Sequence, residues 1–403
     1  MTSATNSARP LEGLRVIEAG QLLAGPFAAT ILGYYGAEVI KVEPPEGGDP
    51  IRRWRVVKDG TSLWWYSLAR NKKCVTLDLR QPAGRDIMRR LVNQSDVLVE
   101  NFRPGTMEKW GLGPDDFKPT NPGLIYTRIS GYGQTGPYAP RPGFASVCEG
   151  FGGFRYVNGF PGEPSVRPNL SIGDTLAGVH AALGVLLAYI GRERVTKGAG
   201  QVVDVAIFES IFNLMEAVVP EFDGAGVVRE ASGSTLTGIV PSNIYPTLDG
   251  KTIIIGANTN PMFQRLCELM GDASMGHDPR YQENNQRVEH QAEIDGVIGR
   301  WTGSLTQTDV LAQLESAGVA AGPIYNVQDM FADPQYQARG LFEEVATQSG
   351  PLKIPAIIPR LADTPGKTEW AGAMLGAHND EIYAGLLGMS AADIAGLKQA
   401  QII

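Results

Sequence analysis

Short apolar runs alternate with segments of helical periodicity through the first half of the chain. Continuous apolar runs, typical of buried strands, lie at 14–19, 37–43, 73–79, 96–100, 124–129 and 201–206. Between them, apolar residues recur at helical spacing in 27–35, 82–94 and 175–190. Apolar strands that alternate with helices are typical of a parallel sheet with helices on its faces. We therefore predict the α/β fold class, with a Rossmann-like open sheet in a large domain.

The pattern changes after residue 220. Residues 221–243 are rich in Gly, Ser and Thr, which is typical of a linker. Residues 244–255 predict a hairpin that turns at Asp249-Gly250, and helical periodicity follows in 261–270, 286–302 and 307–317. The predicted order is the N-terminal part of a large Rossmann-like domain at 1–220, a linker at 221–243, a small α+β domain at 244–325, and a return linker with the C-terminal part of the large domain at 326–403.

Composition limits the classes of protein that the chain can represent. The 403 residues are 43% hydrophobic and 19% charged, which supplies a packed interior and exceeds the usual size of one core. A net charge of −8 argues against a nucleic-acid partner. The segment 1–10 is polar, and no run reaches the roughly 20 apolar residues that span a bilayer. We therefore expect a soluble, cytoplasmic protein without a membrane partner.

Cysteine and histidine side chains are scattered along the chain. Cys74, Cys148 and Cys267 lie far apart, which fits a reducing compartment without a disulfide framework. The four histidines show no spacing typical of metal ligands, so we expect no metal site.

Three loops follow predicted strands and are rich in Gly, Asn, Tyr and Arg, at 20–26, 101–105 and 130–137. Loops at the carboxyl ends of parallel strands are where open α/β sheets bind ligands. The first of them, GQLLAGP, lacks the GxGxxG pattern, which argues against a dinucleotide enzyme. The nearby side chains of Arg52, Arg53 and Arg55 are either solvated at the surface or bind a phosphate or carboxylate group.

Asp174 lies in a glycine-flanked turn, just ahead of a long apolar helical segment. A carboxylate at a helix entry accepts backbone N–H groups and is stabilised as an anion by the helix dipole. Two interpretations stay open on spacing alone. Asp174 is either an ordinary N-cap or a nucleophilic carboxylate of the covalent type.

The chain resembles the class III CoA-transferase family, the group that contains formyl-CoA:oxalate and carnitine CoA-transferases. The resemblance rests on ordered blocks that span almost the whole chain, LEGLRVIEAG, GAEVIKVEPPEGGD, RNKKCVTLDL, DVLVENFRPG, SGYGQTGP, GDTLAGVHAALG, GQVVDVAIFES and AGPIYNV. Further phrases, SLWW, GFGGFRYVNGFPG and GIVPSN, are similar to bacterial succinyl-CoA-dependent members that act on malate, citramalate, mesaconate or itaconate.

The resemblance implies a catalytic centre at Asp174, which would carry an acyl anhydride and then a CoA thioester. It implies coenzyme A as the acyl-CoA co-substrate, no metal, and an interlocked homodimer. The CoA-binding positions implied by the matching blocks are Leu23, Ala24, Asn71, Lys72, Lys73, Asn101, Phe102, Arg103, Lys109 and Tyr132. A second carboxylate on the substrate would require an arginine as its partner, and the candidates are Arg52, Arg155 and Arg167.

The chain departs from the family pattern at three places. Leu23 stands where formyl-CoA transferase has glutamine, and 256–260 replaces its tetraglycine loop, which puts oxalate and formate in doubt. Gly256, Asn258 and Asn260 belong either to a lid or to an ordinary hairpin exit. α-Methylacyl-CoA racemases of the same fold use a histidine where this chain has Phe144, so racemase is the alternative, and a non-catalytic CoA-binding protein is a third.

Overall fold

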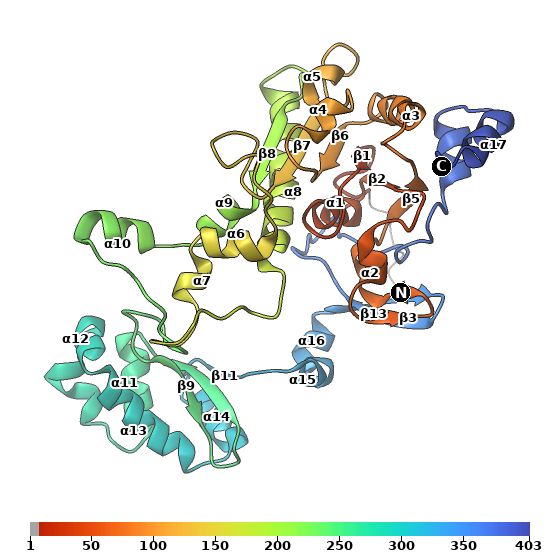
Figure 1. The fold of residues 1–403 in the computed structure, drawn as a ribbon. Coiled ribbons are helices and arrows are strands. Elements are labelled where there is room, and N and C mark those ends of the chain that lie inside the picture. The colour runs from red at the N-terminus through yellow and green to blue at the C-terminus, as the bar shows by residue number, and fades with distance from the viewer. Residues whose placement is uncertain (1–7) are drawn as a thin grey trace. The chain divides into compact units, whose positions relative to one another are not determined.

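A computed structural model describes residues 8–403, so most of the polar N-terminal segment, 1–7, lies outside the described residues. The chain divides into two compact units (Figure 1). The first comprises the described residues up to Phe154, with Pro168–Glu216 and Arg339–Ile403; the second comprises Arg155–Arg167 and Ala217–Ala338. The excursion 155–167 joins the second unit by bonds such as that from the Gly233 N–H to the Gly159 carbonyl, 2.8 Å. The segment predicted as a linker, 221–243, lies inside this unit and holds most of helix α10 (Val218–Ala225).

The first unit is built on a six-stranded parallel sheet with the strand order β5-β2-β1-β6-β7-β8. The strands are β1 (Arg15–Glu18), β2 (Glu38–Glu43), β5 (Lys72–Thr76), β6 (Val97–Glu100), β7 (Ile125–Ser130) and β8 (Val202–Ala206). The predicted α/β class and parallel sheet are confirmed. The strand order reverses between β1 and β6, and open sheets of this kind bind ligands outside the carboxyl ends of the strands at that reversal.

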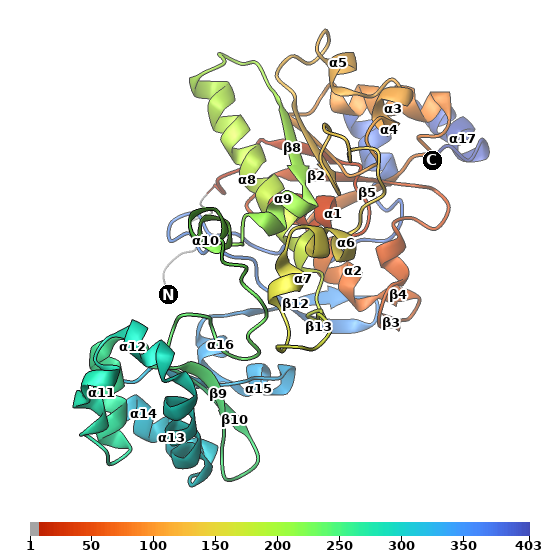
Figure 2. The same ribbon diagram turned by 60° about the vertical axis from the view of Figure 1, so that its left-hand side comes forward.

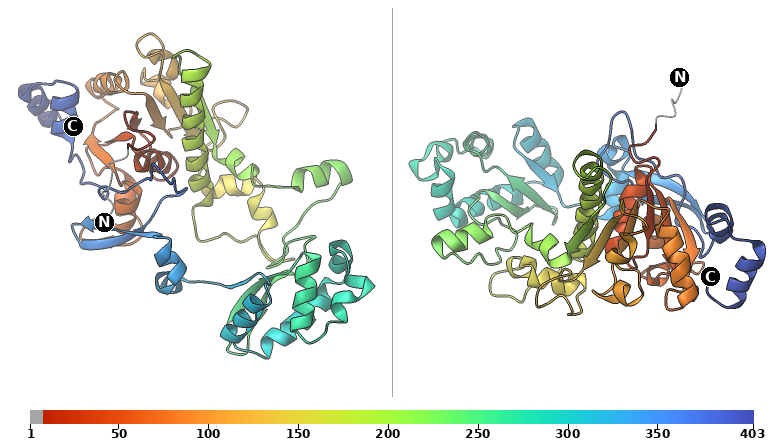
Figure 3. Two further views of the ribbon diagram at one scale, coloured as in Figure 1. Left: turned by 180° about the vertical axis from the view of Figure 1, so that it is seen from behind. Right: turned by 90° about the horizontal axis from the view of Figure 1, so that it is seen from above.

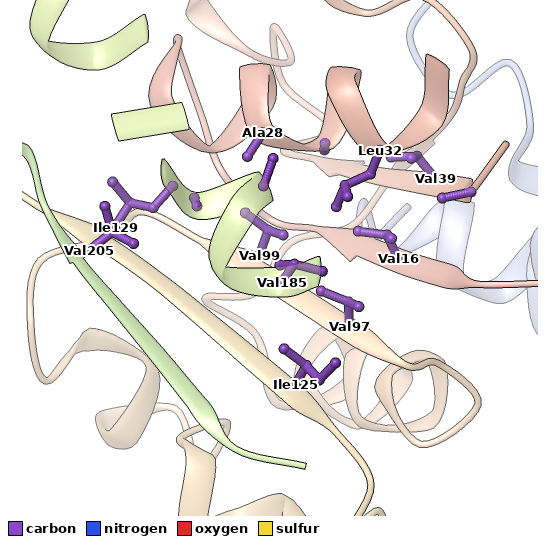
Figure 4. Close-up of a cluster of buried hydrophobic side chains, with 14 of the residues drawn as sticks. Val16, Ala28, Leu32, Val39, Val97, Val99, Ile125, Ile129, Val185 and Val205 are labelled. Atoms are coloured by element: carbon purple, nitrogen blue, oxygen red, sulfur yellow. The ribbon is translucent and has the colours of Figure 1, made fainter. Parts of the chain in front are cut away.

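Helices α1 (Ala24–Tyr34) and α8 (Ile172–Arg194) cover one face of this sheet. Valine and isoleucine side chains from the strands meet Ala28 and Leu32 of α1 and Val185 of α8 in a buried cluster (Figure 4). The opposite face is covered by α3 (Pro82–Val92), the π-helical segment Glu381–Leu386 and α17 (Ala391–Gln399). Both faces of the central strands are therefore buried, as their continuous apolar runs predict.

Shorter elements complete the first unit. The helices are α2 (Leu63–Leu68), α4 (Thr106–Lys109), α5 (Pro114–Phe117), α6 (Ala145–Phe151), α9 (Ile207–Phe212) and the 3-10 helix Pro50–Arg53, and α7 (Phe154–Val157) begins at its edge. Strands β3 (Val57–Lys58) and β4 (Thr61–Ser62) pair, as do β12 (Phe342–Thr347) and β13 (Gly350–Pro355). The β12–β13 hairpin shares a small core with α2, beside which it lies (Figure 2).

Helix α8 is long and apolar enough to cross a bilayer by length and composition alone. In the structure it lies along β7 and β8 and packs against α1 (Figure 3). A β-carbon on Gly178 would approach the Ala24 carbonyl oxygen to 2.9 Å, so glycine lets the two helices meet closely. Its buried alanines and valine mark it as a core helix of the sheet layer.

The second unit holds a three-stranded antiparallel sheet, in the order β11-β10-β9, with helices packed on it. Strands β9 (Ser242–Pro246) and β10 (Thr252–Gly256) form the predicted hairpin, and β11 is Ala321–Pro323. The predicted helix 286–302 is divided at His290 into α12 (Asn284–Glu289) and α13 (Gln291–Gly303). The others are α11 (Asn260–Leu269), α14 (Gln307–Ser316), α15 (Val327–Ala332), α16 (Pro334–Ala338) and the 3-10 helices Met275–His277 and Pro279–Tyr281.

Candidate active site

A cavity of about 330 Å³ opens at the carboxyl ends of β1, β6 and β7. It lies where the sheet order reverses, which is the expected ligand position in such folds. Six of the residues predicted for the site line it, namely Leu23, Ala24, Asn101, Phe102, Arg103 and Asp174. The structure thus brings the predicted nucleophile together with parts of the loops after β1 and β6.

Asp174 is the third residue of α8, and Ser171 occupies the N-cap position. The interpretation of Asp174 as an ordinary N-cap is therefore wrong, because the helix begins before it. A carboxylate in the first turn is stabilised as an anion by the helix dipole. Behind it, a β-carbon on Gly173 would come within 3.1 Å of Ile207 and 3.3 Å of Ala145. Glycine here lets the start of α8 sit tightly against α6 and α9.

Two buried side chains, those of Glu149 and Cys148, form hydrogen bonds close to the start of α8. The Oε1 atom of Glu149 accepts a hydrogen bond from the Gly173 N–H at 3.3 Å. The thiol of Cys148 donates to the Gly131 carbonyl at 3.3 Å. Burial, and then the charges of Asp174 and Glu149, raise the pKa of Cys148 to about 11. The thiol of Cys148 therefore stays protonated near neutral pH and is a poor nucleophile.

The loop after β1 has a fixed and strained backbone. Leu22 has a φ of +64°, a left-handed conformation that side-chain-bearing residues seldom adopt. The Leu22 N–H donates to Oδ1 of Asp49 at 3.1 Å. The Gln21 N–H donates to Oδ1 of Asn101 at 2.8 Å, and the Asn101 amide donates back to the Gln21 carbonyl at 2.8 Å. Asp49 and Asn101 thus hold the wall of the cavity that carries Leu23.

A buried charge cluster lies beneath this loop. Its members, each at most 8% exposed, are Glu18, Lys41, Glu43, Asp49, Arg52 and Lys72. The ammonium of Lys41 lies 2.6 Å from Glu18 and 2.8 Å from Asp49, and it donates to the Gly20 carbonyl at 3.0 Å. Burial lowers the pKa of Lys41, but the carboxylates of Asp49, Glu18 and Glu43 outweigh it and raise the pKa overall. The cluster therefore fixes the loop through charged groups that are kept from water.

Three of the predicted binding residues have side chains whose polar groups are bound within the fold. Lys72 is fully buried and lies 2.7 Å from Glu18. The guanidinium of Arg52 donates twice to Glu43, at 2.7 Å each. Asn71 is 5% exposed, and its amide group bonds to the backbone at Gly33, Lys367 and Glu369. The polar groups of all three side chains therefore form hydrogen bonds or ion pairs inside the protein.

Three other predicted residues do not line the cavity. Lys73 forms ion pairs with Glu38 and Glu381, at 2.6 and 2.7 Å. Lys109 is exposed at the end of α4. The Tyr132 ring packs within an aromatic cluster, with ring centroids 5.4 Å from Phe151 and 6.1 Å from Phe208. Tyr132 therefore stiffens the loop after β7.

The remaining candidates belong to the second unit. Arg155 and Arg167 lie at the two ends of its segment 155–167. Gly256 ends β10, Asn260 begins α11, and Asn258 lies between the two elements. Arg287, which is fully buried, donates to the Asn258 carbonyl at 2.7 Å and to Oδ1 of Asn260 at 2.9 Å. The loop 256–260 is thus anchored from within its own unit.

We expect Arg287→Met to destabilise the second unit by about 3 kcal/mol, because it leaves buried carbonyl groups without a donor. Amide hydrogen exchange should rise first in 256–260. The matched control is Arg300→Met, which removes an exposed arginine of α13. Equal exchange in both variants would contradict the anchoring role.

The position that carries a histidine in racemases also lines the cavity, and here it is Phe144. Gly131 and Gly143 stack closely beside it, since a β-carbon on Gly131 would lie 2.7 Å from the Cα of Gly143. Among the described residues that line the cavity there is no histidine. Phenylalanine cannot exchange a proton, so this wall supplies shape but no acid or base.

A family model described as CoA-transferase family III matches residues 11–379. The chain belongs to CoA-transferase family III. The resemblance drawn from the sequence blocks is thereby confirmed, and with it the class of enzyme. The chain is 47% identical to the succinyl-CoA--D-citramalate CoA-transferase of Chloroflexus aurantiacus, over 98% of both proteins. It is 41% identical to the alpha subunit of the succinyl-CoA--L-malate CoA-transferase of that organism, covering 98% of this chain and 92% of the subunit.

A solved structure supports the fold. A CAIB/BAIF family protein from Brucella suis matches this CoA-transferase family member with a TM-score of 0.81 and 34% identity. The match covers 94% of this chain and 100% of the other. Within residues 8–403, no group of three or more His, Cys, Asp or Glu side chains is arranged to hold a metal ion.

Sequence reasoning missed several residues of the cavity and its support, above all Asp49, Lys41 and Arg141. Arg141 lines the cavity, and its guanidinium lies 3.6 Å from the centroid of the Tyr138 ring. The signal for Lys41 was present in the sequence, because a charge inside an apolar strand needs a buried partner. Asp49 follows two glycines and a proline pair, which indicate a turn but not its contacts.

Proposed function

We propose that this enzyme moves CoA from succinyl-CoA to a small dicarboxylic acid such as malate, citramalate, mesaconate or itaconate. The observation that carries the proposal is the placement of Asp174 in the cavity at the sheet reversal. The relatives named above use succinyl-CoA with citramalate or malate, which supports this substrate class. An acid of four or five carbons fits within about 330 Å³ together with a thioester end.

The proposed reaction begins with an attack by a carboxylate oxygen of Asp174 on the thioester carbonyl carbon. The carbon–sulfur bond breaks, CoA leaves as the thiolate, and an acyl-aspartyl anhydride remains. The thiolate then attacks the aspartyl carbonyl carbon, which releases succinate and leaves an aspartyl-CoA thioester. The acceptor carboxylate runs the two steps in reverse and restores Asp174.

Each tetrahedral step needs hydrogen-bond donors for an oxyanion. Leu23 and Ala24, at the start of α1, line the cavity with Asp174, and the first N–H groups of a helix have no partner within it. We propose that these N–H groups serve as the donors. Closure over the cavity would also be needed, because anhydrides hydrolyse in water.

The longer arm of CoA needs a path away from Asp174. A neighbouring cavity of about 290 Å³ shares Gln21 and Phe102 with the Asp174 cavity. Phe102 meets Trp110 edge to face, with ring centroids 5.3 Å apart. We propose that CoA passes Phe102 toward Trp110, with Arg103 and Lys109 near its phosphates.

We propose that the enzyme works in the cytoplasm as a homodimer. The side of α8 that faces away from the sheet exposes Leu183, Leu187 and Ile190, from 50% to 61% each. These positions recur at helical spacing and form a continuous apolar stripe, which a second copy would cover.

The test is a coupled assay with succinyl-CoA and each candidate acid. The proposal expects a new acyl-CoA and an equal amount of free succinate, with no exchange of the α-hydrogen of an acyl-CoA for solvent deuterium. Deuterium uptake without CoA transfer would replace the proposal with racemisation. Binding of CoA without either reaction would identify a non-catalytic protein.

A further inference from the structure

A second cavity in the first unit shares Leu23 with the Asp174 cavity. Its volume is about 550 Å³. Most of its lining is apolar and comes from Trp64, Leu170, Ile172, Leu176, Val179 and Leu214. Among the described residues that line it, Arg55 alone carries a charge. The cavity therefore combines apolar walls with a single cation.

The first turns of α8 separate the two cavities. Asp174 faces the first cavity, while Ile172, Thr175 and Leu176 line the second. Side chains at neighbouring positions of a helix point in different directions, so one turn of α8 lines both cavities. A molecule whose reacting carboxyl lies at Asp174 can thus extend past Leu23 toward Arg55.

Arg55 is available to an external anion. No described acidic residue forms an ion pair with it, whereas Arg52 is committed to Glu43. The guanidinium carbon of Arg55 lies 4.5 Å from the centroid of the Trp64 ring, so an aromatic face supports the cation. Its backbone φ of +59° is left-handed, a conformation that is costly for a residue with a long side chain. Strain of this kind is found at ligand-binding positions.

We propose that Arg55 binds the distal carboxylate of the dicarboxylic acid and that the second cavity holds its carbon chain. The inference rests on the proposed function and adds the residue that selects diacids over monoacids. A planar guanidinium binds a carboxylate through two parallel hydrogen bonds, and contact with Trp64 holds it in position. A monoacid cannot form this contact, and sites built to bind a polar group reject analogues that lack it.

The first arm of the test compares two acyl-CoA donors of equal chain length. Succinyl-CoA ends in a carboxylate, whereas butyryl-CoA ends in a methyl group. Arg55→Gln should lower kcat/KM for succinyl-CoA by about 30-fold, the value of a charged hydrogen-bonded contact. For butyryl-CoA the change should stay below about threefold, since that contact is absent. Arg55→Lys should recover part of the loss. Arg53→Gln removes a neighbouring arginine that lines neither cavity, and it should change neither rate.

The second arm does not depend on turnover. The Asp174→Ala protein is incubated with CoA and then with phenylglyoxal, and modification of Arg55 and Arg53 is followed by peptide mass spectrometry. Succinate should protect Arg55 but not Arg53, and butyrate should protect neither. Absence of CoA transfer in the wild type together with protection of Arg55 would sink the proposed function and keep the binding site.

Three results overturn the inference itself. An equal loss of both donors in Arg55→Gln would show a general structural role. Absence of protection by succinate would show that Arg55 does not bind the acid. A loss of dimer in Arg55→Gln on light scattering would show that a second copy of the chain covers the cavity.

Discussion

Asp174→Ala is expected to lower kcat for CoA transfer from succinyl-CoA by at least about 10⁴-fold, which is the scale seen when a covalent nucleophile is removed. The residue lies in the first turn of α8 and faces the cavity at the sheet reversal. In the proposed mechanism the carboxylate of Asp174 itself forms the covalent bonds, so no neighbouring group would replace it. Binding of CoA should change by less than about threefold, since the residue acts on the acyl carbon and not on the nucleotide.

The matched control is Asp204→Asn, which removes another carboxylate of the same unit. Asp204 accepts a hydrogen bond from the Gln134 N–H at 3.0 Å and does not line the Asp174 cavity. This variant should keep most of the activity. If Asp174→Ala retained more than about a tenth of kcat, a role as nucleophile would be excluded.

Asp49→Ala is expected to reduce kcat by about 100-fold, because a displacement of about 1 Å at a reacting centre has that effect. The carboxylate holds the Leu22 N–H at 3.1 Å and the Lys41 ammonium at 2.8 Å, and it is fully buried. Without it, Leu22 should leave its left-handed conformation and carry Leu23 and Ala24 out of place. Breaking a buried ion pair should also cost about 3 kcal/mol of unfolding free energy.

Loss of stability alone is separated from mispositioning by two further variants. Glu343→Ala removes a carboxylate that accepts from the Tyr34 hydroxyl at 2.8 Å, away from the cavity lining. It should lower the melting temperature with little change in kcat. Adding Leu22→Gly to Asp49→Ala should recover part of kcat, because glycine adopts a positive φ at no steric cost. Equal losses of kcat in Glu343→Ala and Asp49→Ala would contradict the positioning role.

Much of the fold followed from the sequence because its strands are continuous apolar runs. Strands buried on both faces need such runs, and 37–43 and 96–100 coincide closely with β2 and β6. The division of helix 286–302 at His290 was missed, since helical periodicity continues through the break. The role of 155–167 was missed too, because its partner segment near residue 233 is distant in sequence.

The candidate site was predictable where a loop directly follows a strand. Asn101 and Phe102 follow β6, and their place at the sheet edge depends only on the parallel arrangement. The ion pairs of Lys72 and Arg52 could not be predicted, because a charge in a sequence does not reveal its buried counter-charge. Arg52 lies within the 3-10 helix Pro50–Arg53, whereas Arg55 follows this helix and has a φ of +59°. Tertiary structure determines the direction that the chain takes after the helix, so the sequence did not distinguish the two arginines.

The most direct test of the account is the intact mass of the protein after mixing with succinyl-CoA. The account predicts a covalent adduct with the mass of CoA less water on the wild type, absent from Asp174→Ala and removed by hydroxylamine, which cleaves thioesters. Peptide mapping should place it on Asp174. Efficient CoA transfer without any adduct on rapid quenching, or an adduct that persists in Asp174→Ala, would contradict the covalent mechanism.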